Sequence, residues 1–385
     1  MTLRPAGRRR HRRPDSVLVI HSSDEMYGAD RILLEVVTTL RDLDGLAVEV
    51  WLPSDTGTGA LSAVLAERGF VTRRMPLPVL RRANLSPRGM LQLARTGWTT
   101  FRSLRRARAP FVYLMTSACL PVAPIARLAG ADHVVVHLQE MWSRSDRRIL
   151  SLPAAFCTAA IAISPSVADA SGLRRPPVTV VENGVSLPAQ QDDEPGSPHR
   201  PVSDPPCYLV ASRWNAWKGH RTLLTAWELA GCPGTLLVAG GPPPAGAAVD
   251  VPVLVDELVS RPETVRVVGE VDSIAPLLDQ ADALVLPSDR PEPFGLVLIE
   301  AFGQRTPVVA SRGGGPSGIV TPGVDGWLFD RGSAAALADL FRSLDRRALQ
   351  AAGHRAELTY RQRYTPESYR SRLSTALAAV LRATS

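Results

Sequence analysis

Short apolar runs alternate along the chain with longer amphipathic segments, and this alternation predicts parallel β-sheets whose strands are joined by helices. In the first half, the runs that predict strands are Val17–Ile20, Ala47–Leu52, Phe70–Met75, Phe111–Met115, His133–Leu138, Ala159–Ile163 and Val178–Val181. Helical periodicity lies between them at Arg31–Leu40, Ala60–Arg68, Pro87–Arg108 and Pro121–Leu128. Together these segments predict one complete doubly wound domain.

A second alternating set follows a stretch of different composition. Residues 187–206 contain Gln190-Gln191-Asp192-Asp193-Glu194, several prolines and no apolar periodicity, as is typical of a linker. The strands predicted after it are Tyr208–Ser212, Thr235–Ala239, Val265–Val268, Ala283–Pro287 and Pro307–Ala310, and the amphipathic segment Pro366–Leu381 closes the chain. We therefore expect an α/β protein with two Rossmann-like domains and a cleft between them.

The expected boundaries follow from these patterns. We predict a basic tail at 1–14, an N-terminal domain at 15–186, a linker at 187–206 and a C-terminal domain at 207–365. The last helix, 366–385, is expected to pack back toward the N-terminal domain. A chain of 385 residues with 45% hydrophobic and 21% charged residues suits two such domains.

Cysteine usage and hydropathy favour a cytoplasmic protein. The four cysteines, at 119, 157, 207 and 232, form no C-x-x-C pair and no metal-ligand spacing, so we expect reduced thiols. No run of 18 or more apolar residues exists, and Val17–Ile20 is too short for a signal peptide. We expect neither a membrane-spanning helix nor a bound metal or cofactor.

The net charge of +7 is unevenly distributed. Six arginines between residues 4 and 13 precede the first acidic residue, Asp15, and residues 81–108 carry eight arginines but no Asp or Glu. Such segments suit an anionic partner, namely a bilayer surface, a lipid-linked phosphate or nucleic acid. A solvated tail and a solvated helix face are the alternatives.

Candidate chemistry concentrates in Ser288–Gly303, where Glu292 and Glu300 flank Pro293-Phe294-Gly295. A predicted strand precedes this loop, and a predicted helix begins at Gly295. Free backbone N–H groups at a helix N-terminus suit a phosphate or a sugar oxygen. Because helical side chains lean toward the N-terminus, Glu300 should point toward the same ligand as Glu292. This is the edge of an open α/β sheet where ligands bind.

Two positive charges fall at a similar place in the second domain. Arg213 follows a predicted strand, and Lys218 stands five residues later, just before a helix that starts near Gly219. Lys218 is the only lysine among 44 Lys and Arg residues. Such a pair can neutralise a diphosphate, especially one that becomes a leaving group. When this short pattern is taken alone, a solvated turn is the better explanation, and the position of the only lysine is what favours a function.

In order and spacing, these motifs resemble the retaining glycosyltransferases of family 4, which have the two-domain GT-B architecture. The resemblance runs over residues 17–330 and rests on Arg213…Lys218-Gly219, Gly240-Gly241-Pro242, Val267-Val268-Gly269-Glu270 and Glu292-Pro293-Phe294-Gly295…Glu300-Ala301. Val181-Glu182-Asn183-Gly184-Val185 is similar to the family's N-G-V segment, and Ile163–Val167 to its serine-containing turn.

The resemblance implies a role for each matching residue. Arg213 and Lys218 would grip the diphosphate of a nucleotide sugar, and Glu300 would bind the ribose hydroxyls. Glu292 would hold hydroxyls of the donor sugar, together with the backbone around Phe294, Gly295 and Leu296. Residues Gly269–Val271 would lie beside the base. Cations near phosphate and carboxylates near hydroxyls are also what the residues suggest without the resemblance.

The N-terminal half departs from the family pattern in two places. Only Gly28, within Tyr27-Gly28-Ala29, matches the family's pair of adjacent glycines. The histidine that usually faces the sugar at a strand end could be His137, by residue type, or Gln139, by its acidic neighbour Glu140; His137 is the preferred assignment. In the C-terminal half, many relatives carry glutamate where Gly318 stands.

The expected activity is transfer of a sugar, with retention, from a UDP- or GDP-linked donor to a hydroxyl of a glycan or lipid-linked acceptor. Arg213, Lys218 and Glu292 would carry the chemistry, and the resemblance implies same-face attack without a metal. Cell-surface polysaccharide or glycoconjugate synthesis, on the cytoplasmic side and in peripheral contact with an anionic membrane through residues 4–13 and 81–108, would suit the basic segments.

Three other functions remain possible on the sequence. A nucleotide-sugar epimerase shares the architecture but needs acid and base groups that the sequence does not identify. A non-catalytic nucleotide-sugar-binding protein would explain the altered Gly28 and Gly318 positions. A nucleic-acid binder could use the basic tail, although no recognised nucleic-acid motif accompanies it. Incubation with labelled nucleotide sugars separates them, because only the transferase transfers or hydrolyses the donor.

Overall fold

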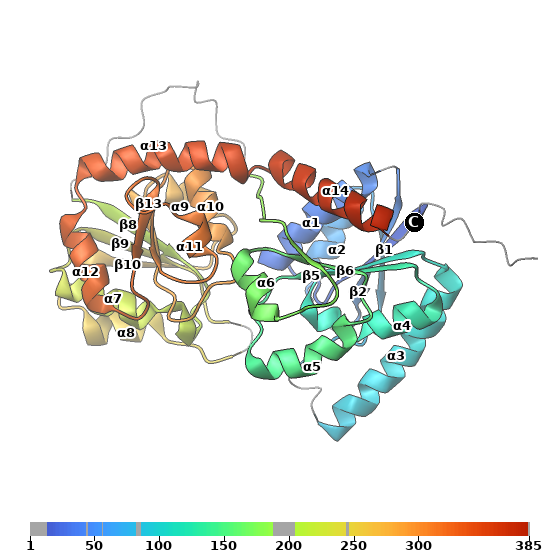
Figure 1. The fold of residues 1–385 in the computed structure, drawn as a ribbon. Coiled ribbons are helices and arrows are strands. Elements are labelled where there is room, and N and C mark those ends of the chain that lie inside the picture. The colour runs from blue at the N-terminus through green and yellow to red at the C-terminus, as the bar shows by residue number, and fades with distance from the viewer. Residues whose placement is uncertain are drawn as a thin grey trace, which may run out of the picture. The chain divides into compact units, whose positions relative to one another are not determined.

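The computed structural model describes residues 14–43, 45–55, 57–81, 86–187, 205–243 and 246–383. The chain divides into two compact units: unit 1 contains Met1–Glu182 and Tyr369–Ser385, and unit 2 contains Asn183–Ser368. The basic tail and most of the expected linker lie outside the described residues. Figure 1 colours the chain from its N-terminus to its C-terminus.

Unit 1 is built on a seven-stranded parallel sheet with the strand order β3-β2-β1-β4-β5-β6-β7. Its strands are β1 (Ser16–Ile20), β2 (Ala47–Pro53), β3 (Val71–Met75), β4 (Phe111–Leu114), β5 (His133–Leu138), β6 (Ala159–Ala162) and β7 (Val178–Val180). Its helices are α1 (Gly28–Asp42), α2 (Ala60–Glu67), α3 (Pro87–Ala107), α4 (Val122–Ala129), α5 (Arg144–Ala154) and α6 (Pro165–Ser171), with α14 (Pro366–Ala383) at the end of the chain. The order reverses between β1 and β4, which creates the switch point of a doubly wound sheet.

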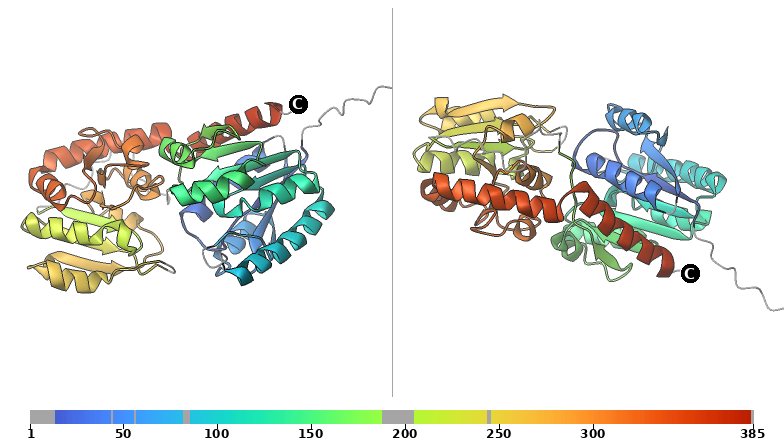
Figure 2. Two further views of the ribbon diagram at one scale, coloured as in Figure 1. Left: turned by 60° about the horizontal axis from the view of Figure 1, so that its bottom comes forward. Right: turned by 90° about the horizontal axis from the view of Figure 1, so that it is seen from above.

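Helices cover both faces of this sheet. Figures 1 and 2 show α1 and α14 on one face and α3, α4 and α5, which pack side by side, on the other. Strand β5 is therefore buried along its whole length, as expected for a strand covered on both faces. Helix α14 is anchored by the buried side chains of Tyr369, Leu373 and Leu377 and by an ion pair between Arg370 and Glu35 (3.2 Å).

Unit 2 contains a six-stranded parallel sheet with the order β10-β9-β8-β11-β12-β13. Its strands are β8 (Cys207–Ala211), β9 (Thr235–Ala239), β10 (Val265–Gly269), β11 (Ala283–Leu286), β12 (Val308–Ser311) and β13 (Gly326–Phe329). Its helices are α7 (His220–Leu229), α8 (Val251–Leu258), α9 (Ala275–Leu278), α10 (Leu296–Gly303), α11 (Pro316–Ile319), α12 (Ala334–Ser343) and α13 (Arg346–Arg363). Tyr208, Trp227 and Phe341 meet edge to face in its core, with ring centroids 4.9 to 5.8 Å apart.

The expectation of two doubly wound α/β domains is confirmed. Strand β13 was not expected, because Gly326-Trp327-Leu328-Phe329 is short and two of its residues are only half-buried. The division between units falls at residue 182 rather than 186. Val185 explains the difference, because its N–H donates to the Tyr364 carbonyl (3.1 Å) and its carbonyl accepts from the Tyr360 hydroxyl (2.8 Å), both in unit 2.

Membrane-crossing potential can be judged on the described part of the chain. Among the helices found there, none is both long enough and apolar enough to traverse a bilayer.

Candidate functional site

The loop after β11 in unit 2 holds an ion pair that links two of the predicted motifs. Lys218 Nζ lies 2.8 Å from Glu292 Oε1, and the Ser288 hydroxyl donates a hydrogen bond to the same oxygen. The Glu292 side chain is only 5% exposed and that of Lys218 is 18% exposed, so the two charges compensate each other in a poorly solvated place. The structure thus joins residues 74 positions apart in the sequence.

The backbone before α7 fixes the position of Lys218. Gly219 has a φ of 77°, and a Cβ on it would lie 1.9 Å from the Pro287 carbonyl oxygen, so only glycine allows this approach. The Asp289 N–H donates to the Trp217 carbonyl (2.8 Å), which ties the lysine loop to the end of β11. The Trp217 ring lies under the ammonium group, with Nζ 4.3 Å from the ring centroid.

Helix α10 begins at the same loop, as predicted. Gly295 precedes it with a φ of 99°, and Leu296 is its first residue. Phe294 is buried and meets Tyr364 edge to face at 6.2 Å, while Glu300 is buried on the helix. Glu292 is therefore only four residues before Leu296, where α10 begins. The buried Phe294 anchors the segment between them to the core.

The glycine run after β12 packs directly against this loop. The Gly315 N–H donates to the Glu292 carbonyl (2.8 Å). A Cβ on Gly314 would lie 2.0 Å from that carbonyl oxygen, and one on Gly315 would lie 2.1 Å from the Phe294 carbonyl oxygen. The two glycines are needed for close backbone approach, whereas a Cβ on Gly318 would meet open space.

Arg213 is exposed at the carboxyl end of β8, next to the loops that follow β9 and β10. Trp214 N–H donates to the Gly241 carbonyl (2.8 Å), and Gly240 N–H donates to the Gly269 carbonyl (2.7 Å). A Cβ on Gly241 would lie 2.6 Å from Cγ of the Glu270 side chain, so the two loops are in close contact. The structure therefore gathers all the C-terminal motifs at one edge of the unit 2 sheet.

His137 lies in the interior of unit 1. Its side chain is completely buried on β5, where Nδ1 lies 3.1 Å from the Tyr113 hydroxyl. Burial lowers the pKa of His137 to about 3, so the imidazole is neutral. Period-2 alternation did not predict the depth at which the residue lies. The assignment of His137 rather than Gln139 as a sugar ligand stays a prediction.

Gln139 and Gly28 are the two other candidate site residues of the N-terminal half. Gln139 is half-buried after β5 and donates from Nε2 to the Met115 carbonyl (2.8 Å). Gly28 is the first residue of α1, directly after the exposed Tyr27.

Sequence reasoning missed a buried pair at the end of β1. His21 Nε2 lies 2.8 Å from Asp30 Oδ1, and the Ser23 hydroxyl donates to the same carboxylate oxygen. Burial disfavours the Asp30 carboxylate, but the hydrogen bond and charge of His21 and the Ser23 hydroxyl outweigh it and lower the pKa of Asp30. A histidine directly after the first predicted strand was the signal for this pair.

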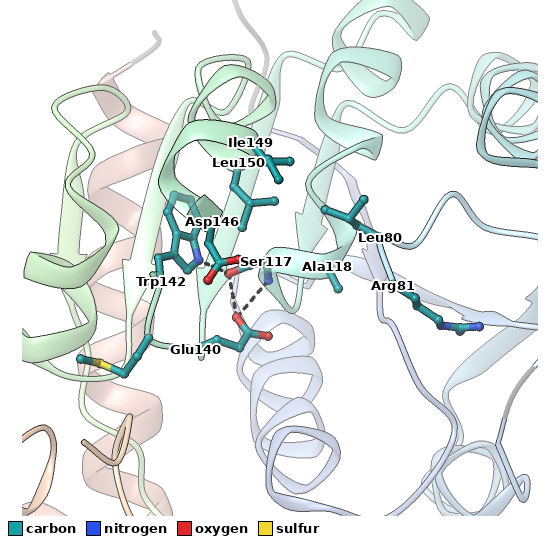
Figure 3. Close-up of a pocket in the computed structure, with 10 residues that line it drawn as sticks. Leu80, Arg81, Ser117, Ala118, Glu140, Trp142, Asp146, Ile149 and Leu150 are labelled. Carbon is teal, nitrogen blue, oxygen red and sulfur yellow. Dashed lines mark hydrogen bonds between the residues drawn. The ribbon is translucent and has the colours of Figure 1, made fainter. Parts of the chain in front are cut away.

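A cavity of about 340 Å³ opens near the carboxyl ends of β4 and β5 (Figure 3). The Ser117 hydroxyl donates to Glu140 Oε2 (2.7 Å) and accepts from Trp142 Nε1 (2.8 Å). Burial raises the pKa of Glu140 despite the hydrogen bonds from Ser117. The remaining lining residues are Leu80, Arg81, Ala118, Met141, Asp146, Ile149 and Leu150.

Within the described ranges, no group of three or more His, Cys, Asp or Glu side chains is placed to hold a metal ion. The cysteines described in the structure are all free, and burial raises the pKa of Cys119 and Cys157 to about 12.

Comparison with known proteins finds one matching family model and several curated relatives. The model of "Glycosyl transferases group 1" matches residues 193–360. Glycogen synthase of Mycobacterium tuberculosis is 31% identical over 262 residues, which cover 66% of this chain and 58% of that enzyme. N-acetyl-alpha-D-glucosaminyl L-malate synthase of Bacillus anthracis is 31% identical over 122 residues, 31% of this chain and 32% of that enzyme. The chain thus spans little more than half the length of the first of these curated relatives.

Solved structures agree over almost the whole chain. HepE from Anabaena, in complex with UDP and glucose, superposes with a TM-score of 0.74 at 23% identity, covering 94% of this chain and 99% of HepE. Sucrose-phosphate synthase from Thermosynechococcus elongatus has a TM-score of 0.73 at 19% identity, covering 96% of this chain and all of that one. The chain has the GT-B fold, and its residues 193–360 match the family of group 1 glycosyl transferases.

Proposed function

We propose that this protein is a retaining glycosyltransferase that moves a sugar from a UDP- or GDP-linked donor to a hydroxyl of a glycan or lipid-linked acceptor. The observation that carries the proposal is the pair of Lys218 and Glu292 beside the N-terminus of α10. A cation, a carboxylate and a helix N-terminus match the phosphates and hydroxyls of a nucleotide sugar.

The proposed chemistry uses residues already in place. When a donor binds, Lys218 exchanges its contact with Glu292 for the diphosphate, and Arg213 adds a second positive charge. Both cations then stabilise the negative charge that grows on the leaving diphosphate as the anomeric carbon becomes oxocarbenium-like. Because the protein supplies these cations, we propose that no metal or other cofactor takes part.

Glu292 acts in this proposal as a ligand of sugar hydroxyls. Its Oε1 is released when Lys218 turns to the diphosphate, while Ser288 continues to orient the carboxylate. Glu300 binds the ribose, and the backbone of Phe294, Gly295 and Leu296 binds the donor sugar. Attack from the face of the leaving phosphate, with that phosphate accepting the proton of the acceptor hydroxyl, gives retention.

A donor screen tests the proposal directly. The purified chain is incubated with UDP- and GDP-sugars, with and without EDTA, and products are identified by NMR. UDP-glucose is a sensible first donor, because HepE was solved with UDP and glucose. We expect release of the nucleoside diphosphate without added metal and a product anomer that matches the donor. Interconversion of sugars would indicate an epimerase instead, and binding without turnover would indicate a non-catalytic protein.

We further propose that the reaction takes place at the cytoplasmic surface of an anionic membrane, in cell-surface polysaccharide or glycoconjugate synthesis. Helix α3 supports this proposal, because it carries five arginines and no acidic residue and exposes Trp98 (63%) and Leu91 (54%) to solvent. The tail at residues 4–13, which was expected to contribute, lies outside the described residues.

A further inference from the structure

The unit 1 cavity opens onto an exposed apolar strip, and the two together suit a ligand with a polar and an apolar end. On the basis of the transferase function proposed above, we propose that the acceptor is an amphiphile. Its hydroxyl-bearing head group binds in the cavity beside Glu140, and its hydrocarbon chain lies along the outer side of α5 (Figure 3).

The cavity lies where a doubly wound sheet binds ligands. Ser117 begins the short 3-10 helix that follows β4, and Glu140 follows β5, so both project from the carboxyl edge of adjacent strands. The strand order reverses at the neighbouring pair, β1 and β4, which is the switch point where a crevice forms. The Thr116 hydroxyl donates to the Ser22 hydroxyl (3.0 Å) and connects the loops across this point.

Glu140 is a prepared hydrogen-bond acceptor. Oε2 is held by the Ser117 hydroxyl (2.7 Å) and Ser117 N–H (3.3 Å), and Trp142 Nε1 fixes Ser117 from the other side. The other carboxylate oxygen points away from Ser117 (Figure 3). A carboxylate held in this way accepts hydrogen bonds from ligand hydroxyls, and its partial burial strengthens them. The head group is therefore a polyol or a sugar.

The apolar side of the cavity continues onto the surface. Leu80, Leu150 and Ile149 line the cavity, and Ile149 is at the same time 49% exposed. Leu152 (74% exposed) follows three residues later on α5, so the two side chains are neighbours on the helix surface. Phe156 (43% exposed), just after the helix, extends this strip.

Because the apolar strip continues from the cavity, an amphiphilic acceptor fits this surface better than a wholly polar glycan does. A glycan would use Glu140 but would leave Leu152 and Phe156 in water. A hydrocarbon chain covers them, and each methylene that is fully buried strengthens binding by a factor of roughly four.

Binding to the whole chain, without donor, tests the inference. The probes are n-octyl β-D-glucopyranoside, kept below its critical micelle concentration, and methyl β-D-glucopyranoside, with affinities measured by ligand-observed NMR. We expect the octyl glycoside to bind at least tenfold more tightly. The double variant Leu152→Ser/Phe156→Ser should reduce its affinity to that of the methyl glycoside and leave the methyl glycoside unaffected, while Glu140→Gln should weaken both.

Leu229→Ser is the matched control, because Leu229 is similarly exposed (51%) but lies on α7 in unit 2. It should leave both affinities unchanged. Equal affinities of the two glycosides, or an octyl affinity that is insensitive to Leu152→Ser/Phe156→Ser, would overturn the inference. If Glu140→Gln fails to fold, the double variant at the surface decides alone.

Donor hydrolysis separates this inference from the proposed function. Release of nucleoside diphosphate without an acceptor depends on unit 2 residues and should be normal in Leu152→Ser/Phe156→Ser, whereas transfer to an alkyl glycoside should fall at least tenfold. If the donor is hydrolysed and octyl and methyl glycosides are used equally well as acceptors, the inference of an amphiphilic acceptor is refuted while the proposed transferase function stands. If no donor releases its nucleoside diphosphate, either alone or with an alkyl glycoside present, the transferase is refuted, and the chain-length dependence of binding still decides the inference about the cavity.

Discussion

Lys218 and Glu292 form an ion pair, and any donor that binds to Lys218 has to compete with it. Both side chains are poorly exposed, so removing either leaves the other charged and without its main partner. A diphosphate offers Lys218 a stronger partner, since it carries more charge than one carboxylate. In the proposed mechanism, the Glu292 carboxylate therefore holds Lys218 until the diphosphate replaces it.

Substitution at this pair should reduce turnover. We expect Lys218→Ala and Glu292→Gln each to lower kcat at least tenfold, or about 1.4 kcal/mol in barrier. The double variant should lose less than the product of the single effects, because the two residues act on each other. Arg221→Ala is the control, since Arg221 is exposed and pairs only loosely with Glu257 (3.5 Å). Normal rates in both single variants would refute the site assignment.

Buried neutral histidines should make stability depend on pH. Burial lowers the pKa of His137 to about 3, and burial together with the charge of Lys218 lowers that of His220 to about 4, both from 6.5. Between these values and 6.5 the unfolded chain binds protons that the folded chain excludes. The free energy of unfolding should therefore fall as pH drops below 6.5, by up to about 1.4 kcal/mol per pH unit for each histidine.

Urea unfolding between pH 4 and pH 7 measures this slope. His137→Gln should flatten it, because glutamine can still interact with the Tyr113 hydroxyl but does not titrate. His354→Gln, at an exposed position on α13, should leave the slope unchanged. A slope in His137→Gln as steep as in the parent protein would contradict the assignment of a buried neutral imidazole.

At the residue level, the sequence predicted where the candidate side chains lie along the elements better than it predicted what they contact. The spacing of Glu292, Gly295 and Glu300 located the loop and the start of α10 correctly. The contact of Lys218 with Glu292 could not be predicted, because it depends on how two loops 74 residues apart meet. The depth of His137 was also beyond the sequence, since a fully covered strand has no polar side to reveal it.

The elements were predicted to within a few residues wherever hydrophobic periodicity was strong. Strands β5 and β9 were predicted without error, and α3 and α14 within two residues. Helix α3 shows where the pattern was insufficient. Trp98, Phe101 and Leu104 are all apolar, so the sequence alone does not tell which of them are buried. Leu104 packs inward at 3% exposure, whereas Trp98 is exposed. Only the neighbouring α4 decides which side of the helix is covered.

The outward side of α3 should bind anionic bilayers. Arg88, Arg95 and Arg102 follow one another at intervals of seven residues, as do Leu91 and Trp98, so arginines and apolar side chains alternate on one exposed face. Leu91→Ser/Trp98→Ser should reduce binding to vesicles containing phosphatidylglycerol at least tenfold, and added salt should weaken the binding of the parent protein. Flotation with vesicles measures both effects.

Two controls accompany this experiment. Leu358→Ser changes a comparably exposed leucine (47%) on α13 and should not affect vesicle binding. Vesicles of phosphatidylcholine alone should bind much less protein. Equal binding to both lipids, or to duplex DNA but not to vesicles, would exclude an anionic membrane as the partner of α3.

At the scale of the whole molecule, the residues of the proposed donor site belong to unit 2 and the cavity belongs to unit 1. The sequence predicted two doubly wound domains because each half repeats the alternation of strands and helices. It did not place the division at residue 182, because the hydrogen bonds of Val185 to Tyr360 and Tyr364 are contacts between distant segments.

Nucleotide binding should therefore protect particular segments of unit 2. We expect UDP or GDP to slow amide hydrogen exchange most strongly in residues 212–219 and 288–300, where the loops after β8 and β11 are tied together. Exchange measured by mass spectrometry reports this, and Lys218→Ala should lose the protection. Protection that is centred on the unit 1 cavity would contradict the assignment of the donor site.

Unit 2 is an insertion in the topological sense, since the chain leaves unit 1 after Glu182 and returns to it at Tyr369. The hydrogen bond from Val185 N–H to the Tyr364 carbonyl (3.1 Å) joins the outgoing and returning segments a few residues from these two points. A domain whose two ends are held side by side can be cut out as one continuous piece, and its ends can be joined by a short bridge. Residues 183–368 are therefore a continuous segment that can be expressed alone to test the proposed nucleotide-sugar binding, or transplanted into another GT-B protein.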